Sequence, residues 1–395
     1  MKNRIGILGG GQLALMLANT AVRMGIRPLI LVADLNCPVA LFHSQVKVGS
    51  FRDPVILADF LSRVETVIFE NEFVDCQVLA DAAKPFDTQF IPALPVLALY
   101  QDKLKQKELF RRLKIPSSEF CQVLSESSNE ASVEAQLSEL LAQWGGSLVL
   151  KWSRMGYDGH GVLFLESDPR QARSFLQKAH ALKSQVYAER KVSFRRELAL
   201  VCVARNSEEF GFYPLVVTEQ DKGICSRVLG PSTALGVSER MEVLAQEYAR
   251  KISQATGLVG TFAIEFFETD AGELWVNEVA PRVHNSGHYT QNACLTDQFE
   301  NHLRAALGFP LGPISARPAF AMLNLLGPDA DSLRVGAIPQ PSGRVFSHGY
   351  GKSESRPRRK MGHLNGVADS VEEMNELLRE LEACRNDWVK GMSDV

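Results

Sequence analysis

Short apolar runs alternate with helix-like segments through the first hundred residues, and this alternation constrains the fold more than any other feature. Strand-like runs cover residues 4–8, 28–32 and 65–70, and a helical pattern covers residues 12–24. Strands that alternate with helices favour a parallel sheet whose strands are joined by crossover helices. The sequence therefore predicts an α/β domain with a Rossmann-like parallel sheet over residues 1–100.

A different pattern follows this region. A charged helix over residues 101–115 stops before Pro116, and strand-like runs then dominate, at residues 148–151, 161–165, 185–189 and 197–203. Gly, Pro and Ser become more frequent near residue 310, and an amphipathic helix covers residues 370–384. We therefore expect an α+β domain over residues 101–310 and a small C-terminal domain over residues 311–395.

Composition excludes several classes of protein. Hydrophobic residues make up 45% of the 395 residues, and 43 Lys and Arg against 46 Asp and Glu give a net charge of −3. This balance is typical of a globular protein and gives no general attraction to nucleic acid or to an anionic membrane. The seven scattered cysteines form no CxxC pattern, and the N-terminal run lacks the features of an export signal. We expect a cytoplasmic protein that binds neither nucleic acid nor a membrane.

A glycine-rich segment lies between the first expected strand and the first expected helix. Residues 9–14 (GGGQLA) match the pattern G-x-G-x-x-A, and Asp34 follows Ala14 by 20 residues. Glycines at this position let backbone N–H groups approach a phosphate at a helix N-terminus. Three interpretations remain open: NAD or FAD, another phosphate-bearing ligand, and a purely structural turn.

A second glycine-rich segment follows a lysine. Lys151 ends one apolar run, residues 154–162 (RMGYDGHGV) contain three glycines, and a further apolar run begins. This order is strand, loop, strand, so the segment is not a Walker A loop. It suits a lid over a polyphosphate, with Lys151 supplying positive charge. An ordinary glycine-rich hairpin with an exposed lysine is the alternative.

Two glutamates lie in apolar strand-like runs that form an expected hairpin. If the turn is centred at Ala271 and Gly272, Glu265 and Glu278 face each other on neighbouring strands. Opposed carboxylates repel, and a dication such as Mg²⁺, held together with nucleotide phosphates, best offsets that cost. Asn277 could add a neutral oxygen if its side chain reaches around the strand. A turn shifted by one residue would instead direct both glutamates to solvent.

Two polar loops complete the set. Residues 281–288 (PRVHNSGH) follow the hairpin and are rich in hydrogen-bond donors, as expected of a substrate loop. His284 and His288 lack the HExxH pattern, which argues against zinc. A basic loop over residues 350–363 on a slightly acidic chain favours an anionic small molecule over nucleic acid. A solvated loop is the alternative.

These motifs, in this order, resemble the ATP-grasp superfamily and, within it, the 5-(carboxyamino)imidazole ribonucleotide synthase family. The resemblance covers nearly the whole chain and implies an ATP-grasp fold with an N-terminal Rossmann-like domain and a small C-terminal domain. The matching segments are residues 6–13 (GILGGGQL), 69–72 (FENE), 156–161 (GYDGHG), 197–198, 277–281 (NEVAP), Arg282, 284–288 (HNSGH), 297–302 (DQFENH), 350–352 and 359–363 (RKMGH).

The resemblance implies that ATP lies between two α+β subdomains. Lys151 would contact the phosphates, residues 156–162 would close over them, Glu189 and Val192 would meet the adenine, and Glu197 the ribose. The implied ATP contacts are Lys103, Lys151, Gly156, Tyr157, Asp158, Gly159, His160, Gly161, Glu189, Val192, Glu197, Gln220, Asn277 and Glu278, with Glu265 and Glu278 as the Mg²⁺ ligands.

The implied reaction is the ATP-dependent carboxylation of 5-aminoimidazole ribonucleotide by bicarbonate, through carboxyphosphate, in purine biosynthesis. The implied contacts with this acceptor are Gly11, Gln12, Glu72, His284, Asn285, Ser286, Arg359 and Lys360, and the implied catalytic residues are Tyr157, Arg282 and Lys360. The resemblance also implies a homodimer.

The chain departs from the family pattern at several positions, which we expect to surround the acceptor and the ATP periphery. They are Ala14, Leu15, Phe73, Lys103, Met155, Val217, Thr218, Gln220 and Val283. An ATP-grasp ligase with another acceptor and a nucleotide-binding protein with weak catalysis therefore remain open. A dehydrogenase is the weakest alternative, because it leaves Lys151, the loop at 156–161 and the glutamate pair without a role.

Overall fold

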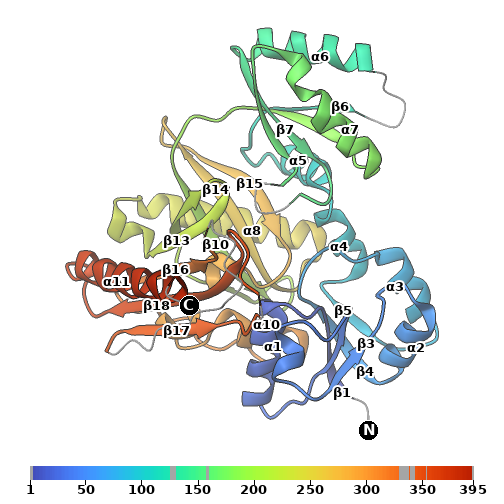
Figure 1. Cartoon of the computed structure of the whole chain (residues 1–395), viewed down its shortest axis with the longest axis vertical. Coiled ribbons are helices and arrows are strands. Elements are labelled where there is room, and N and C mark those ends of the chain that lie inside the picture. Colours follow the sequence, from blue (N-terminus) through green and yellow to red (C-terminus); the bar gives the residue numbers. More distant parts are fainter. Residues whose placement is uncertain are drawn as a thin grey trace.

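A five-stranded parallel sheet forms the N-terminal part of the structure (Figure 1). The structure is a computed structural model that describes residues 3–124, 130–156, 160–328, 338, 343–352 and 354–393. The strand order β3-β2-β1-β4-β5 confirms the predicted Rossmann-like sheet, drawn in blue in Figure 1. Its elements are β1 (Asn3–Leu8), α1 (Gln12–Arg23), β2 (Leu29–Val32), β3 (Val46–Val48), α2 (Pro54–Ser62), β4 (Val64–Phe69), α3 (Cys76–Ala83), β5 (Gln89–Ile91) and α4 (Leu94–Tyr100). Helices cover both faces, so the central strands β1, β2 and β4 are largely apolar and buried.

A smaller antiparallel sheet projects from the molecule at the top of Figure 1. Its strand order is β6-β9-β7-β8, and α6 and α7 cover it. The elements are α5 (Lys103–Leu113), β6 (Phe120–Leu124), α6 (Glu130–Gln143), β7 (Ser147–Trp152), β8 (Val162–Glu166), α7 (Arg173–Ala181) and β9 (Val186–Arg190). The strands predicted at residues 148–151, 161–165 and 185–189 correspond to β7, β8 and β9.

A nine-stranded sheet forms the centre, in the order β15-β14-β10-β12-β13-β16-β18-β17, with β11 paired to β10. The C-terminal strands extend this sheet through the β13–β16 pair, so the predicted small C-terminal domain continues the central sheet. The elements are β10 (Phe194–Ala204), β11 (Phe210–Phe212), β12 (Val216–Asp221), β13 (Ile224–Gly230), α8 (Glu239–Thr256), β14 (Gly260–Thr269), β15 (Leu274–Ala280), α9 (Thr290–Ala293), α10 (Gln298–Ala306), β16 (Ala319–Leu326), β17 (Val345–Gly349), β18 (Lys360–Ala368) and α11 (Met374–Ser393).

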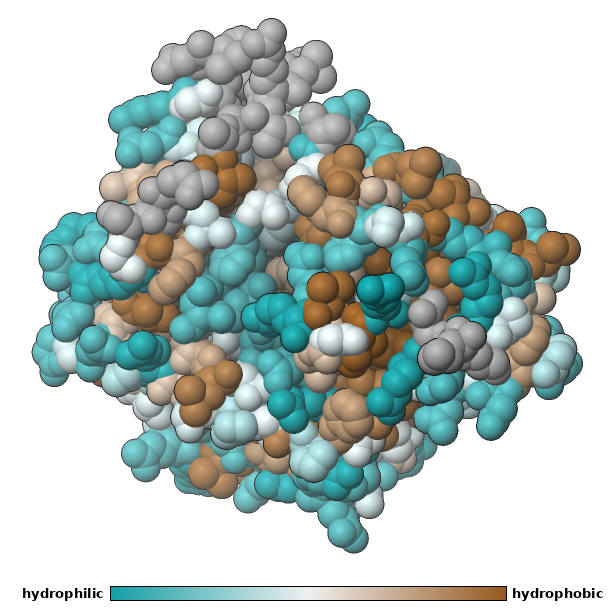
Figure 2. Space-filling view, turned by 90° about the horizontal axis from the view of Figure 1, so that it is seen from below, coloured by the Kyte–Doolittle hydropathy of each residue, from teal (hydrophilic) through white to brown (hydrophobic). Residues whose placement is uncertain are grey.

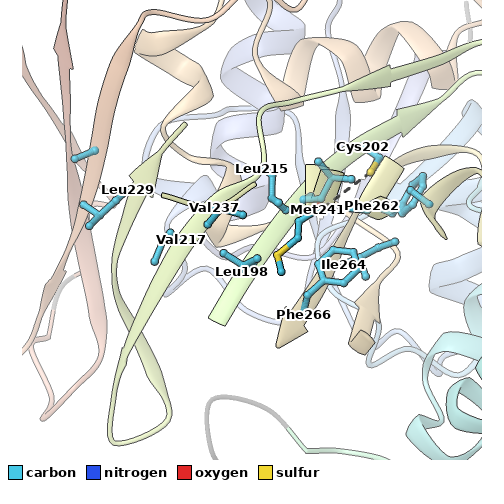
Figure 3. Close-up of a cluster of buried hydrophobic side chains, with 14 of the residues drawn as sticks. Leu198, Cys202, Leu215, Val217, Leu229, Val237, Met241, Phe262, Ile264 and Phe266 are labelled. Carbon is cyan, nitrogen blue, oxygen red and sulfur yellow. Dashed lines mark hydrogen bonds between the residues drawn. The ribbon is translucent and has the colours of Figure 1, made fainter. Parts of the chain in front are cut away.

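The central sheet is buried on both faces around β10. Leu198 and Cys202 pack with Phe262, Ile264 and Met241 of α8 in the cluster of Figure 3. The alternate residues of β10 pack against a second cluster on the opposite face. Polar residues of β10 therefore lie near its N-terminal end, where Glu197 is found. No helix in the described part of the chain is long and apolar enough to cross a membrane.

The glycine-rich turn between β1 and α1 is filled by a side chain of the protein itself. The Gly11 N–H donates to Glu70 Oε2 at 2.7 Å, and burial raises the pKa of the Glu70 carboxyl. The carboxylate thus lies at the helix N-terminus, where a dinucleotide phosphate would bind. Asp34 is exposed and accepts from the Asn36 N–H in a local turn. This arrangement argues against the NAD or FAD interpretation of the turn.

Gly11→Ala should destabilise the fold, because a Cβ at this position would lie 1.9 Å from Glu70 Oε1. Displacing Glu70 also removes its hydrogen bond from the Gly11 N–H, so we expect a loss of about 1–3 kcal/mol in the free energy of unfolding. Urea unfolding measures this loss. Gly391→Ala in α11, where a Cβ would meet nothing within 4 Å, is the control and should be neutral or stabilising. Equal stability of both variants would contradict the tight packing at Gly11.

His302 of α10 should make stability fall at mildly acidic pH. Its Nδ1 accepts from the Thr261 N–H at 2.9 Å, and burial lowers the pKa of His302 to about 4. The unfolded chain, with a histidine pKa of roughly 6.5, binds a proton that the native state excludes, so this stability is present above pH 6.5 and is lost as pH falls toward 4. Between pH 7 and pH 5, the free energy of unfolding of His302→Gln should fall by about 2 kcal/mol less than that of the parent, as measured by urea unfolding. The exposed His180→Gln is the control, and matching losses in parent and His302→Gln would contradict the assignment.

Candidate active site

Two carboxylates face each other across β14 and β15, at the centre of the structure. Glu265 pairs directly with Glu278 in the antiparallel ladder, which confirms the predicted pairing. On the neighbouring strand, Ala199 of β10 pairs with Glu265, and Glu197 lies two residues earlier on the same face. Three glutamates therefore share one face of the central sheet.

A β-bulge explains how Asn277 joins this group. The register shifts between Glu265 and Phe266, and Asn277 is left without a partner on β14. Asn277 Oδ1 accepts from Lys151 Nζ at 3.2 Å, and Glu278 forms an ion pair with Lys103. In a regular strand, the side chains of residues 277 and 278 would point to opposite faces of the sheet. The bulge lets both side chains reach a lysine, Lys151 for Asn277 and Lys103 for Glu278. The apolar pattern of the hairpin does not predict the bulge.

The two carboxylates are electrostatically different. Burial, followed by the neighbouring Glu278 charge, raises the pKa of Glu265 to about 8. Burial also acts to raise the pKa of Glu278, but the adjacent Lys103 charge outweighs it and lowers this pKa. Glu265 is therefore the harder of the two carboxyls to ionise in the absence of further positive charge. A bound cation would allow both to ionise.

The residues expected at the nucleotide lie on three neighbouring elements. Glu189 of β9 is buried and forms ion pairs with Lys151 and with Lys107. Val192 lies on the connection between β9 and β10. Glu197 is hydrogen-bonded to Gln220 of β12, and burial raises the pKa of Glu197. Glu189 is linked through Lys151 to Asn277, and Glu197 shares the sheet face of the Glu265–Glu278 pair.

The expected lid is described only in part. Gly156 lies near Lys103, since a Cβ at Gly156 would be 3.9 Å from Lys103 Cε. Gly161 has a φ of +75°, and a Cβ there would lie 2.8 Å from the Trp152 ring. His160 is exposed. Tyr157, Asp158 and Gly159, which carry the proposed lid and one proposed catalytic group, lie outside the described residues.

The expected acceptor residues include a second ion pair. Glu72 pairs with Arg282, and this charge lowers the pKa of Glu72 although burial alone would raise it. Gln12 is the first residue of α1 and is half-buried, next to Gly11 and the Glu70 carboxylate. These contacts place the end of the parallel sheet beside the polar loop that follows β15.

His284 connects the acceptor side with the carboxylate pair. Its Nδ1 accepts from the Ser286 N–H at 3.3 Å, so the proton of the neutral ring lies on Nε2, which is 3.6 Å from Glu265 Oε1. Burial, followed by the charge of Arg282, lowers the pKa of His284 to about 3, so the ring is neutral at physiological pH. Asn285 exchanges two hydrogen bonds with Asn324 of β16. The polar loop is therefore held against the central sheet.

The two basic residues expected to hold a phosphate differ in environment. Lys360 begins β18, and its charge acts on Glu265 and on His284. Arg359 Nη1 donates to the Glu354 carbonyl oxygen at 2.9 Å, and burial lowers the pKa of Arg359. Of the two, Lys360 is the one that acts on the carboxylate pair.

Several contacts around the site follow from no local sequence pattern. Lys107 and Ser118 contact Glu189, and Glu70 fills the glycine-rich turn. The buried His363 stacks with the buried His288 and with the half-buried His348, with ring centroids 4.7 and 4.5 Å apart. Only the tertiary structure makes these residues neighbours, although His288 and His363 lie in segments that the resemblance had identified.

The departures from the family pattern divide between the expected ATP periphery, where Lys103 pairs with Glu278 and Gln220 is hydrogen-bonded to Glu197, and the core. Ala14, Leu15 and Val283 are buried in the core beneath α1, and Val217 is buried in the core beside α8. Substitutions in a core compensate one another through packing volume, so they bear on packing rather than on acceptor choice. Phe73 is exposed.

Family models match three consecutive parts of the chain. A ribonucleotide synthetase preATP-grasp domain matches residues 1–101, an ATP-grasp domain matches residues 108–299, and a phosphoribosylaminoimidazole carboxylase C-terminal domain matches residues 321–377. The first match corresponds to the parallel sheet, the second to the two sheets that enclose the candidate site, and the third to the C-terminal strands.

Curated proteins and solved structures agree with these matches. The N5-carboxyaminoimidazole ribonucleotide synthase of Synechococcus elongatus is 33% identical, over 96% of this chain and 94% of that protein. The carboxyaminoimidazole ribonucleotide synthase of Aspergillus clavatus complexed with ATP has a TM-score of 0.85 at 31% identity, covering 98% of this chain and 99% of that one. The same enzyme with ADP and 5-aminoimidazole ribonucleotide has a TM-score of 0.83 at 30% identity, with the same coverage. The chain therefore belongs to the N5-carboxyaminoimidazole ribonucleotide synthase family of ATP-grasp enzymes.

Proposed function

We propose that this chain is a ligase that uses ATP and bicarbonate to carboxylate 5-aminoimidazole ribonucleotide, giving the N5-carboxyamino ribonucleotide of purine biosynthesis. The main support is the similarity, along the whole chain, to a relative solved with ADP and 5-aminoimidazole ribonucleotide. The two lysines and the glutamate pair between the sheets supply the charges that phosphoryl transfer requires.

The proposed reaction has two steps. A bicarbonate oxygen attacks the γ-phosphorus of ATP, the bond to the β-phosphate oxygen breaks, and ADP and carboxyphosphate form. The exocyclic amine nitrogen of the acceptor then attacks the carboxyl carbon, phosphate leaves, and the amine loses a proton. Lys151 and Lys103 face the transferred phosphoryl group, while Arg282 and Lys360 lie toward the acceptor with the neutral His284. Fixed positive charge stabilises the phosphoryl transition state.

The donor set fits Mg²⁺. No group of three or more His, Cys, Asp and Glu that could hold a metal occurs among the described residues, but an ATP-grasp site needs only two carboxylates, because the phosphates complete the coordination. Glu265 and Glu278 would hold the ion, and the ion pair of Glu278 with the Lys103 ammonium supports a position for positive charge here. The bound ion would neutralise charge on the phosphates.

We further propose that the protein is a cytoplasmic homodimer. Family membership supports both proposals. Apolar residues lie in groups between hydrophilic ones on the face shown in Figure 2. Leu41 and Phe42 are exposed and lie against Gly351, and a second copy could cover such residues. Light scattering on the purified protein would give twice the chain mass of 43.7 kDa for a dimer.

Glu278→Gln should abolish most catalysis while leaving the fold intact. The change removes one proposed Mg²⁺ ligand and the partner of Lys103, so we expect ADP release to fall at least about a hundredfold. The melting temperature should change little, because the amide has the same shape. A coupled ADP-release assay with bicarbonate and 5-aminoimidazole ribonucleotide measures the rate, with the exposed Glu139→Gln as control. Near wild-type ADP release would refute the metal assignment.

Neutralising Arg359 or Lys360 should weaken binding of the acceptor and leave binding of ATP nearly unchanged. If each contacts the 5′-phosphate of the ribonucleotide, Arg359→Ala and Lys360→Ala should raise the acceptor KM roughly ten- to a hundredfold, since a charge-assisted contact is worth about 1.5–3 kcal/mol. The KM for ATP should barely move, because Lys151 and the glycine-rich loop, and not the basic loop, are proposed to contact the phosphates of ATP. The exposed Arg356→Ala is the control. An unmutated protein that hydrolyses ATP but never responds to 5-aminoimidazole ribonucleotide would identify a ligase with another acceptor.

A further inference from the structure

Lys107 is a buried lysine that the proposed reaction does not use. It lies on α5, one turn after Lys103, and is only 2% exposed. Its Nζ donates to Ser118 Oγ at 2.8 Å and lies 3.4 Å from Glu189 Oε1. Ser118 Oγ in turn donates to Glu189 Oε2 at 2.6 Å. The buried ammonium and the hydroxyl together hold the Glu189 carboxylate from one side.

Lys151 holds the same carboxylate from the other side. Its Nζ lies 3.2 Å from Glu189 Oε1, the oxygen that Lys107 also approaches, and it donates to Asn277 Oδ1. Two ammonium groups thus share one carboxylate, and the cluster carries a net charge of +1. The side chain of Lys151 is 14% exposed while that of Lys107 is 2% exposed, so the excess charge is accessible at Lys151.

Burying Lys107 is unfavourable, and its surroundings only partly offset the cost. Burial, together with the Lys151 charge, lowers the pKa of Lys107 to about 8 against the opposing effect of Glu189. Burial acts to raise the pKa of Glu189, yet the two lysines hold it at about 2. Apolar residues often replace buried ion pairs without loss of stability, so stability alone does not account for this lysine.

We propose that Lys107 is a positioning residue that balances the charge of Glu189. Glu189 then fixes Lys151 in place without cancelling the positive charge that Lys151 presents to a polyphosphate. A carboxylate that paired with Lys151 alone would form a neutral pair and would repel incoming phosphates about as strongly as the ammonium attracts them. The buried second lysine removes that repulsion. This inference rests on the proposed contact between Lys151 and the phosphates of ATP.

A charge-rescue experiment tests the proposal. Calorimetric titration with Mg·ATP gives the Kd of the parent protein, of Lys107→Met, and of the double variant Lys107→Met with Glu189→Gln. Lys107→Met should raise the Kd about tenfold, because Glu189 then neutralises Lys151. The double variant removes one positive and one negative charge, so the ratio of its ATP Kd to its AMP Kd should return to within about threefold of the parent's ratio. The ratio is compared because any loss of the adenine contact implied for Glu189 weakens both nucleotides alike. Lys105→Met, at an exposed position of the same helix, is the matched control.

A second readout separates charge balance from simple packing. AMP carries fewer phosphate charges than ATP, so Lys107→Met should weaken AMP binding, measured by competition, much less than ATP binding. Equal losses for the two nucleotides, an unchanged ATP Kd in Lys107→Met, or a double variant whose ratio of ATP Kd to AMP Kd is no better than that of the single variant would each overturn the proposal. If Lys107→Met fails to fold, the double variant alone decides. A ratio well above the parent's in a folded double variant, or its failure to fold, also overturns the proposal. A parent protein that binds no Mg·ATP would instead refute the proposed function.

Discussion

The repulsion between Glu265 and Glu278 is the constraint on which the rest of the site depends. The ladder holds the two carboxylates opposite each other, in strands whose other residues are mostly apolar. Positive charge therefore has to come from other parts of the chain. Lys103 of α5 supplies it directly to Glu278, and Lys360 acts on Glu265 from the C-terminal strands. The carboxylate pair thus draws together segments that the sequence separates by more than two hundred residues.

The sequence predicts the parts of this arrangement that depend on local pattern. The alternation of strands and helices predicts the parallel sheet, and the apolar hairpin runs predict the partnership of Glu265 with Glu278. The bulge at Asn277 escapes prediction because one extra residue in a strand changes the register without changing the apolar pattern. The burial of Lys107 likewise cannot be predicted from the local pattern of the charged helix at residues 101–115, because a lysine in such a helix is normally solvated.

The glycine-rich turn shows how one motif serves different chemistry. Its glycines permit the close approach of an anion to the start of α1, as they do in dinucleotide-binding proteins. Here the anion is Glu70, from the end of the neighbouring strand β4. The motif therefore predicts a fold and a place for negative charge, but the ligand depends on a side chain distant in sequence. Likewise, Ala14 and Val283 depart from the family pattern in the core, where neighbouring volumes compensate.

Helix α5 fixes the distance between the two halves of the nucleotide site. Lys103 pairs with Glu278 of the central sheet, and Lys107 pairs with Glu189 of the smaller sheet. Between them, Gln106 accepts from the Val279 N–H at 2.8 Å and donates to the Val279 carbonyl oxygen at 3.1 Å. The same helix therefore contacts the strand that carries the proposed metal ligand and the strand beside the proposed adenine site. Because its contacts with both strands are made by buried or half-buried polar groups, a shift of either sheet would break several of them at once. The spacing between the lysines and the carboxylates is accordingly a property of the helix as a rigid element.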